Sequence, residues 1–403
     1  MRQLVKALCA VALAACSESK APTAIYSPSA HVAAGDTAAH RPPSPPPSGT
    51  FDARTPAQRV EDMMTRSLTK VSLPADGFSL SADAVHPDIA CPPESWNASR
   101  CWLMYTPYLN SDNAYENPGF LSAENDTSWN TPAGVANPIV PYPGFGKYNS
   151  DPDHAFDPVS RRLVQIYRVV ADGFNNIMIM STGDARRWTT PALAFREANH
   201  DAVSPALIID PDRTAKVWYV RSGSEGCQSR STNVQLRTAR PDSTNLFDHA
   251  EWSPPSAVDL TIPNASAWHL DVAPLGEGRG YIALVAAYQN GWSCGNSNLW
   301  LATSLDGVRW RTYPIPIFWL SMKIAAQRNV ATWYRGTLRY DAETDSLHLW
   351  PSALVGRQWT IYHAGVSLRE LTDALESASP SETRSLAAST PSRLRTLRAI
   401  EMP

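Results

Sequence analysis

Short runs of apolar, β-branched and aromatic residues recur along residues 76–370, and each run is bounded by Gly, Pro, Asn or Asp. Runs of about four to eight such residues between turn formers predict β-strands, and the segments between them lack the apolar period of a helix. The runs also come in pairs of similar layout. The clearest pairs are 163–170 with 176–181, 216–220 with 233–238, 281–288 with 298–303, and 346–350 with 359–363.

A turn that ends in tryptophan recurs beside these strand pairs. Three clear copies have an acidic residue shortly before the tryptophan, and two eroded copies keep mainly the tryptophan itself. The copies are Asp126 with Trp129, Asp184 with Trp188, Asp306 with Trp310, and the eroded ones at Trp252 and Trp359. The tryptophans are about 50 to 65 residues apart, which indicates one supersecondary unit repeated along the chain.

Five units of four short strands predict an all-β fold, a five-bladed β-propeller. The Asp and Gly residues of the recurring turn favour a tight hairpin, and we expect the tryptophan ring to cover the junction between two blades. A two-domain β-sandwich is the alternative. It does not explain why one turn recurs at the same place in every unit.

The recurring turn resembles the Asp-box of sialidases, although the spacing between Asp306 and Trp310 is shorter. The chain more closely resembles the five-bladed glycosidase propellers of the arabinanase, xylosidase and levansucrase group. Polar clusters at the expected starts of the inner strands carry this resemblance, which covers about residues 76–370. The clusters are Glu116–Pro118, Ser150–Pro152, Ser204–Pro205, Trp268–Asp271 and Trp333–Thr337.

The resemblance implies that these clusters meet in an axial funnel that binds a poly- or oligosaccharide. Glycoside hydrolysis needs one protonated and one ionised carboxyl group. Members of the group place an Asp base, a pKa-tuning Asp and a Glu acid on the first three blades, whereas the third cluster here has no Glu. The closest assignment makes Glu116 the acid, Asp151 the base or orienting carboxylate, and Asp271 with His269 the third element. The expected substrate-binding residues are His154, His269, Arg335 and Asn117.

Three alternatives remain open for this funnel. In the first, the protein is a carbohydrate-binding propeller without catalysis. In the second, it is a phosphorylase in which Arg168, Arg335 and a histidine bind phosphate. Glu116 and Asp151 would alternatively cap backbone amides or bind a structural calcium ion in the axial channel. No cofactor is otherwise expected, and fold alone does not choose among these functions.

The composition favours an exported protein. Charged residues make up 18% of the 403 residues, below the roughly 25% of an average globular chain, while the chain has 14 Trp and 34 Pro. The net charge is −3 and no long basic run is present, which disfavours nucleic-acid binding. We expect a monomer.

The first 15 residues combine two basic residues with a short apolar run, as in a secretory signal peptide. Leu13–Cys16 resembles the bacterial lipobox, which predicts lipidation at Cys16 and a lipid anchor in the cell envelope, at the outer membrane or cell surface. Residues 16–75, rich in Pro, Ser and Ala, are expected to form a linker, and residues 371–403 a disordered tail.

Four cysteines remain when Cys9, in the expected signal peptide, and Cys16, at the expected anchor, are set aside. Cys91 and Cys101 flank a short loop before a strand, and Cys227 and Cys294 lie in equivalent loops of neighbouring repeats. An even number of cysteines in an exported protein favours disulfides, so we predict the pairs 91–101 and 227–294. No metal site is expected, because the paired Cys or His spacing of zinc sites is lacking.

Overall fold

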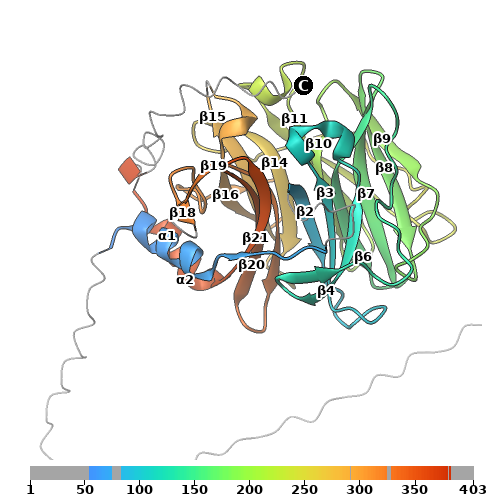
Figure 1. Ribbon diagram of the computed structural model, residues 1–403, viewed down its shortest axis with the longest axis horizontal. Helices are drawn as coiled ribbons and strands as arrows, with labels where there is room; N and C mark the ends of the chain where they lie inside the picture. Colours follow the sequence, from blue (N-terminus) through green and yellow to red (C-terminus); the bar gives the residue numbers. More distant parts are fainter. Residues whose placement is uncertain (1–53, 75–82, 291, 325–327, 380, 383–403) are drawn as a thin grey trace, which may run out of the picture. The chain divides into compact units, whose positions relative to one another are not determined.

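The computed structural model describes residues 54–74, 83–290, 292–324, 328–379 and 381–382. The expected signal peptide, the expected lipidation site Cys16 and most of the expected linker and tail lie outside these residues. The described part of the chain forms five antiparallel sheets (Figure 1), as predicted for a five-bladed β-propeller.

The first four sheets each contain four strands in chain order, from the inner to the outer edge of the blade. Blade 1 consists of β2 (Ala84–Ala90), β3 (Trp102–Pro107), β4 (Gly119–Asn125) and β5 (Ser128–Asn130), and blade 2 of β6 (Tyr148–Asp157), β7 (Arg162–Ala171), β8 (Phe174–Thr182) and β9 (Ala192–Ala198). Blade 3 consists of β10 (Val203–Ile209), β11 (Ala215–Arg221), β12 (Asn233–Ala239) and β13 (Ser256–Val258), and blade 4 of β14 (Ala265–Pro274), β15 (Tyr281–Gln289), β16 (Ser297–Ser304) and β17 (Arg311–Thr312).

The fifth blade combines the two ends of the folded chain. Its strands are β18 (Lys323–Ile324), β19 (Arg328–Asp341), β20 (Ser346–Val355), β21 (Gln358–Ser367) and, at the outer edge, β1 (Thr69–Lys70). Thr69 pairs with His363 of β21, and three residues later Ser72 bridges to Ser128 of β5. The segment that begins at β1 therefore joins blade 5 to blade 1 and closes the ring.

Two helices pack beside the fifth blade (Figure 1). Helix α1 (Pro56–Ser67) begins with a capping box formed by Thr55 and Gln58, and helix α2 is Leu368–Glu376. Val60 and Met64 of α1 lie in the same buried cluster as Leu371 and Leu375 of α2. Neither helix is long and apolar enough to span a membrane, nor is any other described helix.

The folded unit therefore extends beyond the boundaries at 76 and 370 that the sequence predicted. Helix α1 and strand β1 were not predicted, because they lie within residues 16–75, which are rich in Ala, Ser and Pro. The two buried residues of α1, Val60 and Met64, are one helical turn apart, and a pattern this short does not stand out in that background.

The recurring turns join the third and fourth strands of blades 1 to 4. The Asp306 carboxylate accepts the backbone N–H groups of Val308 and Arg309, both at 2.8 Å, so it holds the hairpin closed.

The tryptophans of these turns pack against the preceding blade, as expected: the Trp188 ring lies 5.2 Å from Phe120 of blade 1, and the Trp252 ring 5.7 Å from Phe195 of blade 2. At two junctions a tryptophan in a middle strand of the preceding blade adds a hydrogen bond to the turn. Trp218 Nε1 of β11 donates to the Gly307 carbonyl at 2.7 Å, and Trp350 Nε1 of β20 donates to the Asp126 carbonyl at 2.8 Å.

The fifth copy of the turn was predicted wrongly. Trp359 follows the hairpin between β20 and β21, the second and third strands of blade 5. Because β1 supplies the outer strand of this blade from the other end of the chain, blade 5 has no hairpin in which the fifth copy could lie.

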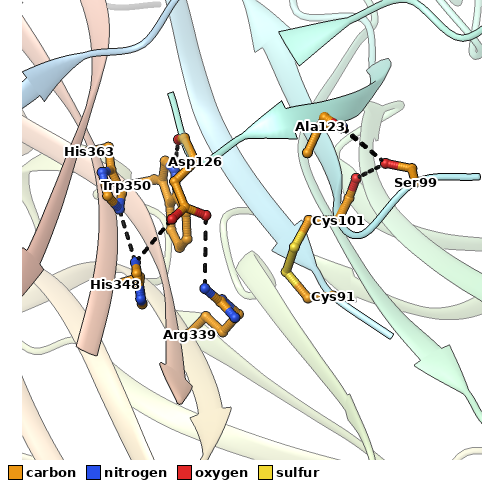
Figure 2. Close-up of a disulfide and its surroundings, with 9 residues drawn as sticks. All are labelled: Cys91, Ser99, Cys101, Ala123, Asp126, Arg339, His348, Trp350 and His363. Carbon is orange, nitrogen blue, oxygen red and sulfur yellow. Dashed lines mark hydrogen bonds and ion pairs between the residues drawn. A yellow bond between two sulfur atoms is a disulfide. The ribbon is translucent and has the colours of Figure 1, made fainter. Parts of the chain in front are cut away.

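Both predicted disulfides are present. Cys91 is bonded to Cys101 in blade 1 (Figure 2), and Cys227 to Cys294 between the loops of blades 3 and 4. The first bond closes the loop between β2 and β3, and the second links two loops that the repeat places side by side.

The inner strands share a β-bulge near their starts. In β2, β6 and β10 the bulge falls at His86, Asp151 and Ser204, which have φ of 51°, 48° and 52° and precede a proline. Proline lacks the N–H of a ladder bond, so it is tolerated at a bulge. His269 and Arg335 lie at the bulges of β14 and β19. The first four of these residues lie where the axial channel begins, whereas the Arg335 side chain reaches deeper, to Asp153.

Candidate active site

Three of the bulge residues form a buried group that we call the axial cluster: His86, Asp151 and His269. The Asp151 Oδ1 atom lies 3.3 Å from His86 Nε2 and 3.6 Å from His269 Nδ1. All three side chains are almost completely buried. They come from three inner strands, so the bulges of the propeller fold bring them together.

The other oxygen of Asp151 is tied to its surroundings. Oδ2 accepts the backbone N–H of Ser204 at 3.2 Å and lies 3.0 Å from Arg168 Nε. Burial acts to raise the pKa of Asp151, but the Arg168 guanidinium and the other nearby positive groups outweigh it and hold the pKa below its ordinary value. Asp151 is therefore ionised, with Oδ1 turned toward the two histidines.

The two histidines are neutral in this environment. Burial lowers the pKa of His86 to about 3, and it lowers the pKa of His269 well below the ordinary value, although Asp151 opposes both shifts. His86 Nδ1 forms a hydrogen bond with Thr106 Oγ1 at 3.0 Å. If Nδ1 carries the proton for this bond, Nε2 presents a lone pair toward Asp151 Oδ1.

The facing atoms of the axial cluster have no hydrogen-bond partner among the described residues: His86 Nε2, His269 Nδ1 and Asp151 Oδ1. Buried polar atoms are normally paired, so an ionised carboxylate oxygen and two ring nitrogens without hydrogen-bond partners are unusual in a protein interior. The three atoms lie within 4.8 Å of one another. Two neutral imidazoles and one carboxylate are a common ligand set for a divalent transition metal, so the residues present fit such an ion.

Glu116 lies next to the axial cluster. Its Oε1 atom is 3.7 Å from His86 Nδ1, and the side chain is buried. Burial and the nearby Asp151 carboxylate raise the pKa of Glu116 well above its ordinary value. The neighbouring Asn117 is held by hydrogen bonds to the Ala114 carbonyl and from Asn149, and this fixes the backbone at Glu116.

A cavity of about 160 Å³, which we call the tyrosine pocket, opens above the axial cluster. His86, Glu116 and Arg168 line it together with Trp268 and three tyrosines, Tyr108, Tyr148 and Tyr334. Both cysteines of the Cys227–Cys294 disulfide also line it. The pocket thus combines aromatic faces, hydroxyl groups and a carboxyl group, as sites for small polar ligands do.

The tyrosine hydroxyls of the pocket keep their protons. Burial, followed by the nearby Glu116 carboxylate, raises the pKa of both Tyr108 and Tyr334 above the ordinary value. The Tyr334 ring packs edge-on against His269, with ring centroids 4.3 Å apart, and lies 5.1 Å from the Trp359 ring. Tyr334 is therefore held in place between the axial cluster and the pocket wall.

The structure brings together four of the predicted site residues and separates the other three. Glu116, Asn117, Asp151 and His269 lie at the axial cluster or beside it. Asp271, His154 and Arg335 lie deeper along the axis. The predicted catalytic trio of Glu116, Asp151 and Asp271 is therefore not gathered in one pocket.

Three aspartates at this depth form what we call the acid layer: Asp88, Asp153 and Asp271. Each lies two residues after a bulge residue of its own strand. Asp271 accepts the N–H of Leu338 at 3.0 Å, and Asp153 accepts that of Leu207 at 2.8 Å. Arg335 NH2 lies 2.6 Å from Asp153 Oδ2, and His154 Nδ1 bonds Asp88. These contacts join β2 to β6, β6 to β10 and β14 to β19, and Arg335 also connects β19 with β6.

The acid layer borders a second cavity, of about 730 Å³, which we call the basal cavity. Asp88, His154 and Asp271 line it, as do Arg339 and Tyr340. His154 and Asp271 thus face the opposite end of the channel from the tyrosine pocket, and Arg335 is buried between the two. None of the three lines the tyrosine pocket.

Sequence reasoning missed His86, the third member of the axial cluster. The first polar cluster was placed at Glu116, but Glu116 precedes β4, and the inner strand of blade 1 is β2. The motif His86-Pro87-Asp88 matches Asp151-Pro152-Asp153 in blade 2. This repeated X-Pro-Asp pattern was the signal that could have located it.

Comparison with known proteins shows that this fold occurs among enzymes that act on sugars. No family model matches the chain. The A type blood N-acetyl-α-D-galactosamine deacetylase of Flavonifractor plautii is 24% identical over 279 residues, which cover 59% of this chain and 35% of the relative. The chain thus spans about a third of the length of that curated relative.

Two solved structures share the architecture. The crystal structure of an N-acetylgalactosamine deacetylase from F. plautii, in complex with blood group B trisaccharide, matches with a TM-score of 0.66 and 19% identity over 77% of this chain and 98% of that chain. A xylan β-1,4-xylosidase from Bacillus halodurans C-125 matches with a TM-score of 0.50 and 12% identity over 70% and 52%. The predicted resemblance to five-bladed glycosidase propellers is thus confirmed for the fold.

Proposed function

We propose that the protein is a metal-dependent hydrolase that removes the acetyl group from an N-acetylated amino sugar of a glycan. The observation that carries the proposal is the axial cluster, in which three facing ligand atoms lack hydrogen-bond partners in the described structure. Two features support it. The tyrosine pocket provides room and hydroxyl donors for a sugar substituent, and the curated relative is named as a deacetylase of an N-acetylated sugar.

The axial cluster would hold the ion through His86 Nε2, Asp151 Oδ1 and His269 Nδ1. A divalent ion at such a site supplies Lewis-acid polarisation of a carbonyl oxygen and makes a water molecule more acidic. Arg168 keeps Asp151 in its ionised form, and Thr106 orients His86. Such outer partners commonly set the tautomer and the orientation of a ligating histidine.

Glu116 is suited to move the proton of the reaction. Deacetylation adds a water oxygen to the acetyl carbon and breaks the C–N bond, and the proton lost by the water reaches the amine nitrogen. Products are acetate and the free amino sugar. A carboxyl group whose pKa is raised binds a proton more tightly than an ordinary carboxylate, so it can accept that proton and return it, and the raised pKa of Glu116 fits this role.

The tyrosines would bind the acetamido group. Tyr108 and Tyr334 line the pocket with hydroxyls that remain protonated, so they can donate hydrogen bonds to a carbonyl oxygen. Their rings, together with Trp268, offer apolar faces to the methyl group and to the sugar ring.

Glycoside hydrolysis by two carboxyl groups is the competing function, and the geometry favours it less. Asp151 is completely buried and paired with Arg168, and Asp271 lies in the acid layer. Besides Glu116, the other carboxyl in the lining of the tyrosine pocket belongs to Glu225, which is exposed. Binding of a sugar without catalysis is the other alternative.

The test measures acetate and reducing sugar released from N-acetylgalactosaminides and N-acetylglucosaminides in parallel. Wild-type protein should release acetate, lose this activity after treatment with a chelator, and regain it with a divalent ion. Asp151→Asn, His269→Gln and Glu116→Gln should abolish it. The matched controls Asp172→Asn and His249→Gln change exposed residues and should leave it intact. Release of reducing sugar without acetate, or activity that survives all three substitutions, would refute the deacetylase.

Export and anchoring are a separate part of the proposal. The signal-like residues 1–15 and the lipobox around Cys16 support a lipid anchor in the cell envelope, and the two disulfides fit an oxidising compartment. Metabolic labelling with a fatty acid should mark the wild-type protein and not Cys16→Ser. Equal labelling of both proteins would contradict anchoring at this residue.

A further inference from the structure

A second group of possible ligands for a metal ion lies away from the axis, at the junction of blades 5 and 1. We call it the closure cluster: Asp126, His348 and His363 (Figure 2). His348 lies on β20 and His363 on β21, while Asp126 belongs to the turn between β4 and β5. The cluster therefore joins the last blade to the first, and it shares no residue with the axial cluster.

The spacing of the three side chains suits a tetrahedral metal ion. His348 Nδ1 is 3.1 Å from His363 Nε2 and 3.5 Å from Asp126 Oδ2, and all three atoms lie within 4.8 Å of one another. Zinc binds nitrogen and oxygen ligands at about 2.0–2.1 Å in a tetrahedral arrangement, which places neighbouring ligand atoms about 3.3 Å apart. The two measured separations bracket this value.

Neighbouring groups hold the cluster in this arrangement. Trp350 donates its Nε1–H to the Asp126 carbonyl at 2.8 Å, and its ring lies 4.9 Å from the His363 ring. Arg339 faces the other carboxylate oxygen of Asp126, Oδ1, at 3.8 Å, so Oδ2 is left for the two histidines. Charged groups beyond a ligand commonly orient it in this way.

Both histidines are able to act as ligands at neutral pH. Burial lowers the pKa of His363 to about 4 and also lowers the pKa of His348, despite the nearby Asp126 carboxylate. A neutral imidazole carries a lone pair on one ring nitrogen, which is the form that binds metal.

Gly365 leaves space beside the two rings. It pairs with His348 across β20 and β21, and a Cβ atom at this position would lie 3.7 Å from His348 Nδ1 and 3.8 Å from His363 Cε1. Its backbone is not in the left-handed region, so the conformation does not require glycine. A larger side chain would extend over the facing nitrogens.

We propose that Asp126, His348 and His363 bind a divalent transition metal, with zinc as the probe, and that this ion fastens blade 5 to blade 1. In the described structure the ring is closed by the short segment from Thr69 to Ser72. An ion bound to both blades would resist opening at this junction. It would stabilise the propeller by its binding free energy, because the unfolded chain does not hold the three ligands together.

The test counts metal sites in the full chain after treatment with a chelator. Bound zinc per chain is measured by elemental analysis after dialysis, and bound cobalt by its visible absorption. His348→Gln, His363→Gln and Gly365→Val should each remove one zinc per chain relative to wild type, while His249→Gln should remove none. Gly365→Val changes no ligand, so its result does not depend on a histidine variant that folds poorly.

A second measurement separates this site from the axial cluster. In the Asp151→Asn background, zinc should raise Tm by about 2–4 °C, the shift expected for roughly 1 kcal/mol in a mid-sized protein, and adding His348→Gln should remove the rise. Zinc stoichiometry that is unchanged by all three closure variants would overturn the proposal. Loss of zinc in Asp151→Asn alone would instead locate all binding at the axial cluster.

Discussion

The axial cluster and the acid layer lie two residues apart on the same inner strands, and both contain buried carboxylates. In the acid layer the carboxylates accept backbone N–H groups of the next blade or pair with Arg335 and His154. In the axial cluster, Asp151 Oδ1 and the two histidine nitrogens that face it have no such partner among the described residues. Buried carboxylates on the same strands therefore differ in their hydrogen bonding, because different groups surround them.

The difference lies in how the buried polar groups of each layer are compensated. A buried carboxylate is tolerated when hydrogen bonds or an opposite charge offset its desolvation, and each carboxylate of the acid layer has at least one such partner. The axial cluster leaves atoms uncompensated next to a pocket that admits ligands. An unsatisfied buried group beside a cavity is a stronger indication of function than a carboxylate alone.

The largest effect is expected for Asp151→Asn. It removes the charged member of the axial cluster and leaves Arg168 buried without its partner, which should cost about 3–5 kcal/mol of stability. Metal affinity and activity should fall by at least about 100-fold, since even loss of an outer partner costs roughly 10 to 100-fold. Urea denaturation and metal titration measure the two effects. Unchanged metal affinity in a folded variant would contradict the assignment of the axial cluster.

Arg335→Met tests the structural role of the acid layer. Arg335 is completely buried and pairs with Asp153, so its loss leaves that carboxylate without its positive partner and should lower the free energy of unfolding by about 3–5 kcal/mol. Metal affinity should change little, because Arg335 holds the acid layer. A variant with wild-type stability and impaired metal binding would reverse the roles given to the two layers.

Thr106→Val should have an intermediate effect confined to the axial cluster. The substitution keeps the volume of the side chain and removes the hydroxyl that bonds His86 Nδ1. The imidazole loses the group that orients it, so metal affinity should fall by roughly 10 to 100-fold. Isothermal titration calorimetry with zinc checks this. Thr312→Val serves as the control, because Thr312 is partly exposed and lies in β17, the outer strand of blade 4. Equal affinity in Thr106→Val and wild type would show that the bond does not position His86.

The acid layer should also make the stability of the protein depend on pH. Burial and the nearby Asp88 carboxylate raise the pKa of Asp271 to about 7, above its value in the unfolded chain. The folded state therefore holds this proton more tightly, and the stability that it contributes is lost as the pH rises from about 4 to 7, by at most about 1.4 kcal/mol per pH unit. Asp271→Asn should flatten this slope in urea denaturation at pH 5, 6 and 7. A slope as steep as that of wild type would exclude Asp271 as its source.

The fold could be predicted because its signals are local and repeated. Each strand pair and each turn before a tryptophan carries its own pattern, and five copies reinforce one another. The disulfides followed for the same reason, since the repeat sets Cys227 and Cys294 in equivalent loops. The closure by β1 could not be predicted, because a two-residue strand has no pattern of its own and is defined by its pairing with β21.

The site was predicted in part. Asp151 and His269 were found because polar residues interrupt otherwise apolar inner strands, and Glu116 because it heads a polar cluster. Asp271 was assigned to the same site although it lies two residues beyond His269. On a β-strand such a step moves a side chain by about 7 Å along the same face, and here it leads from the axial cluster to the acid layer.

The sequence by itself determined which segments become blades and which few residues are polar inside them, because strand pattern and turn chemistry are properties of neighbouring residues. Only the tertiary structure decided that His86 meets Asp151 and His269, that Asp271 joins Asp88 and Asp153, and that His348 and His363 face Asp126. These contacts depend on where the bulges fall and on how the ring closes. Both are set by packing between blades that are distant in the chain.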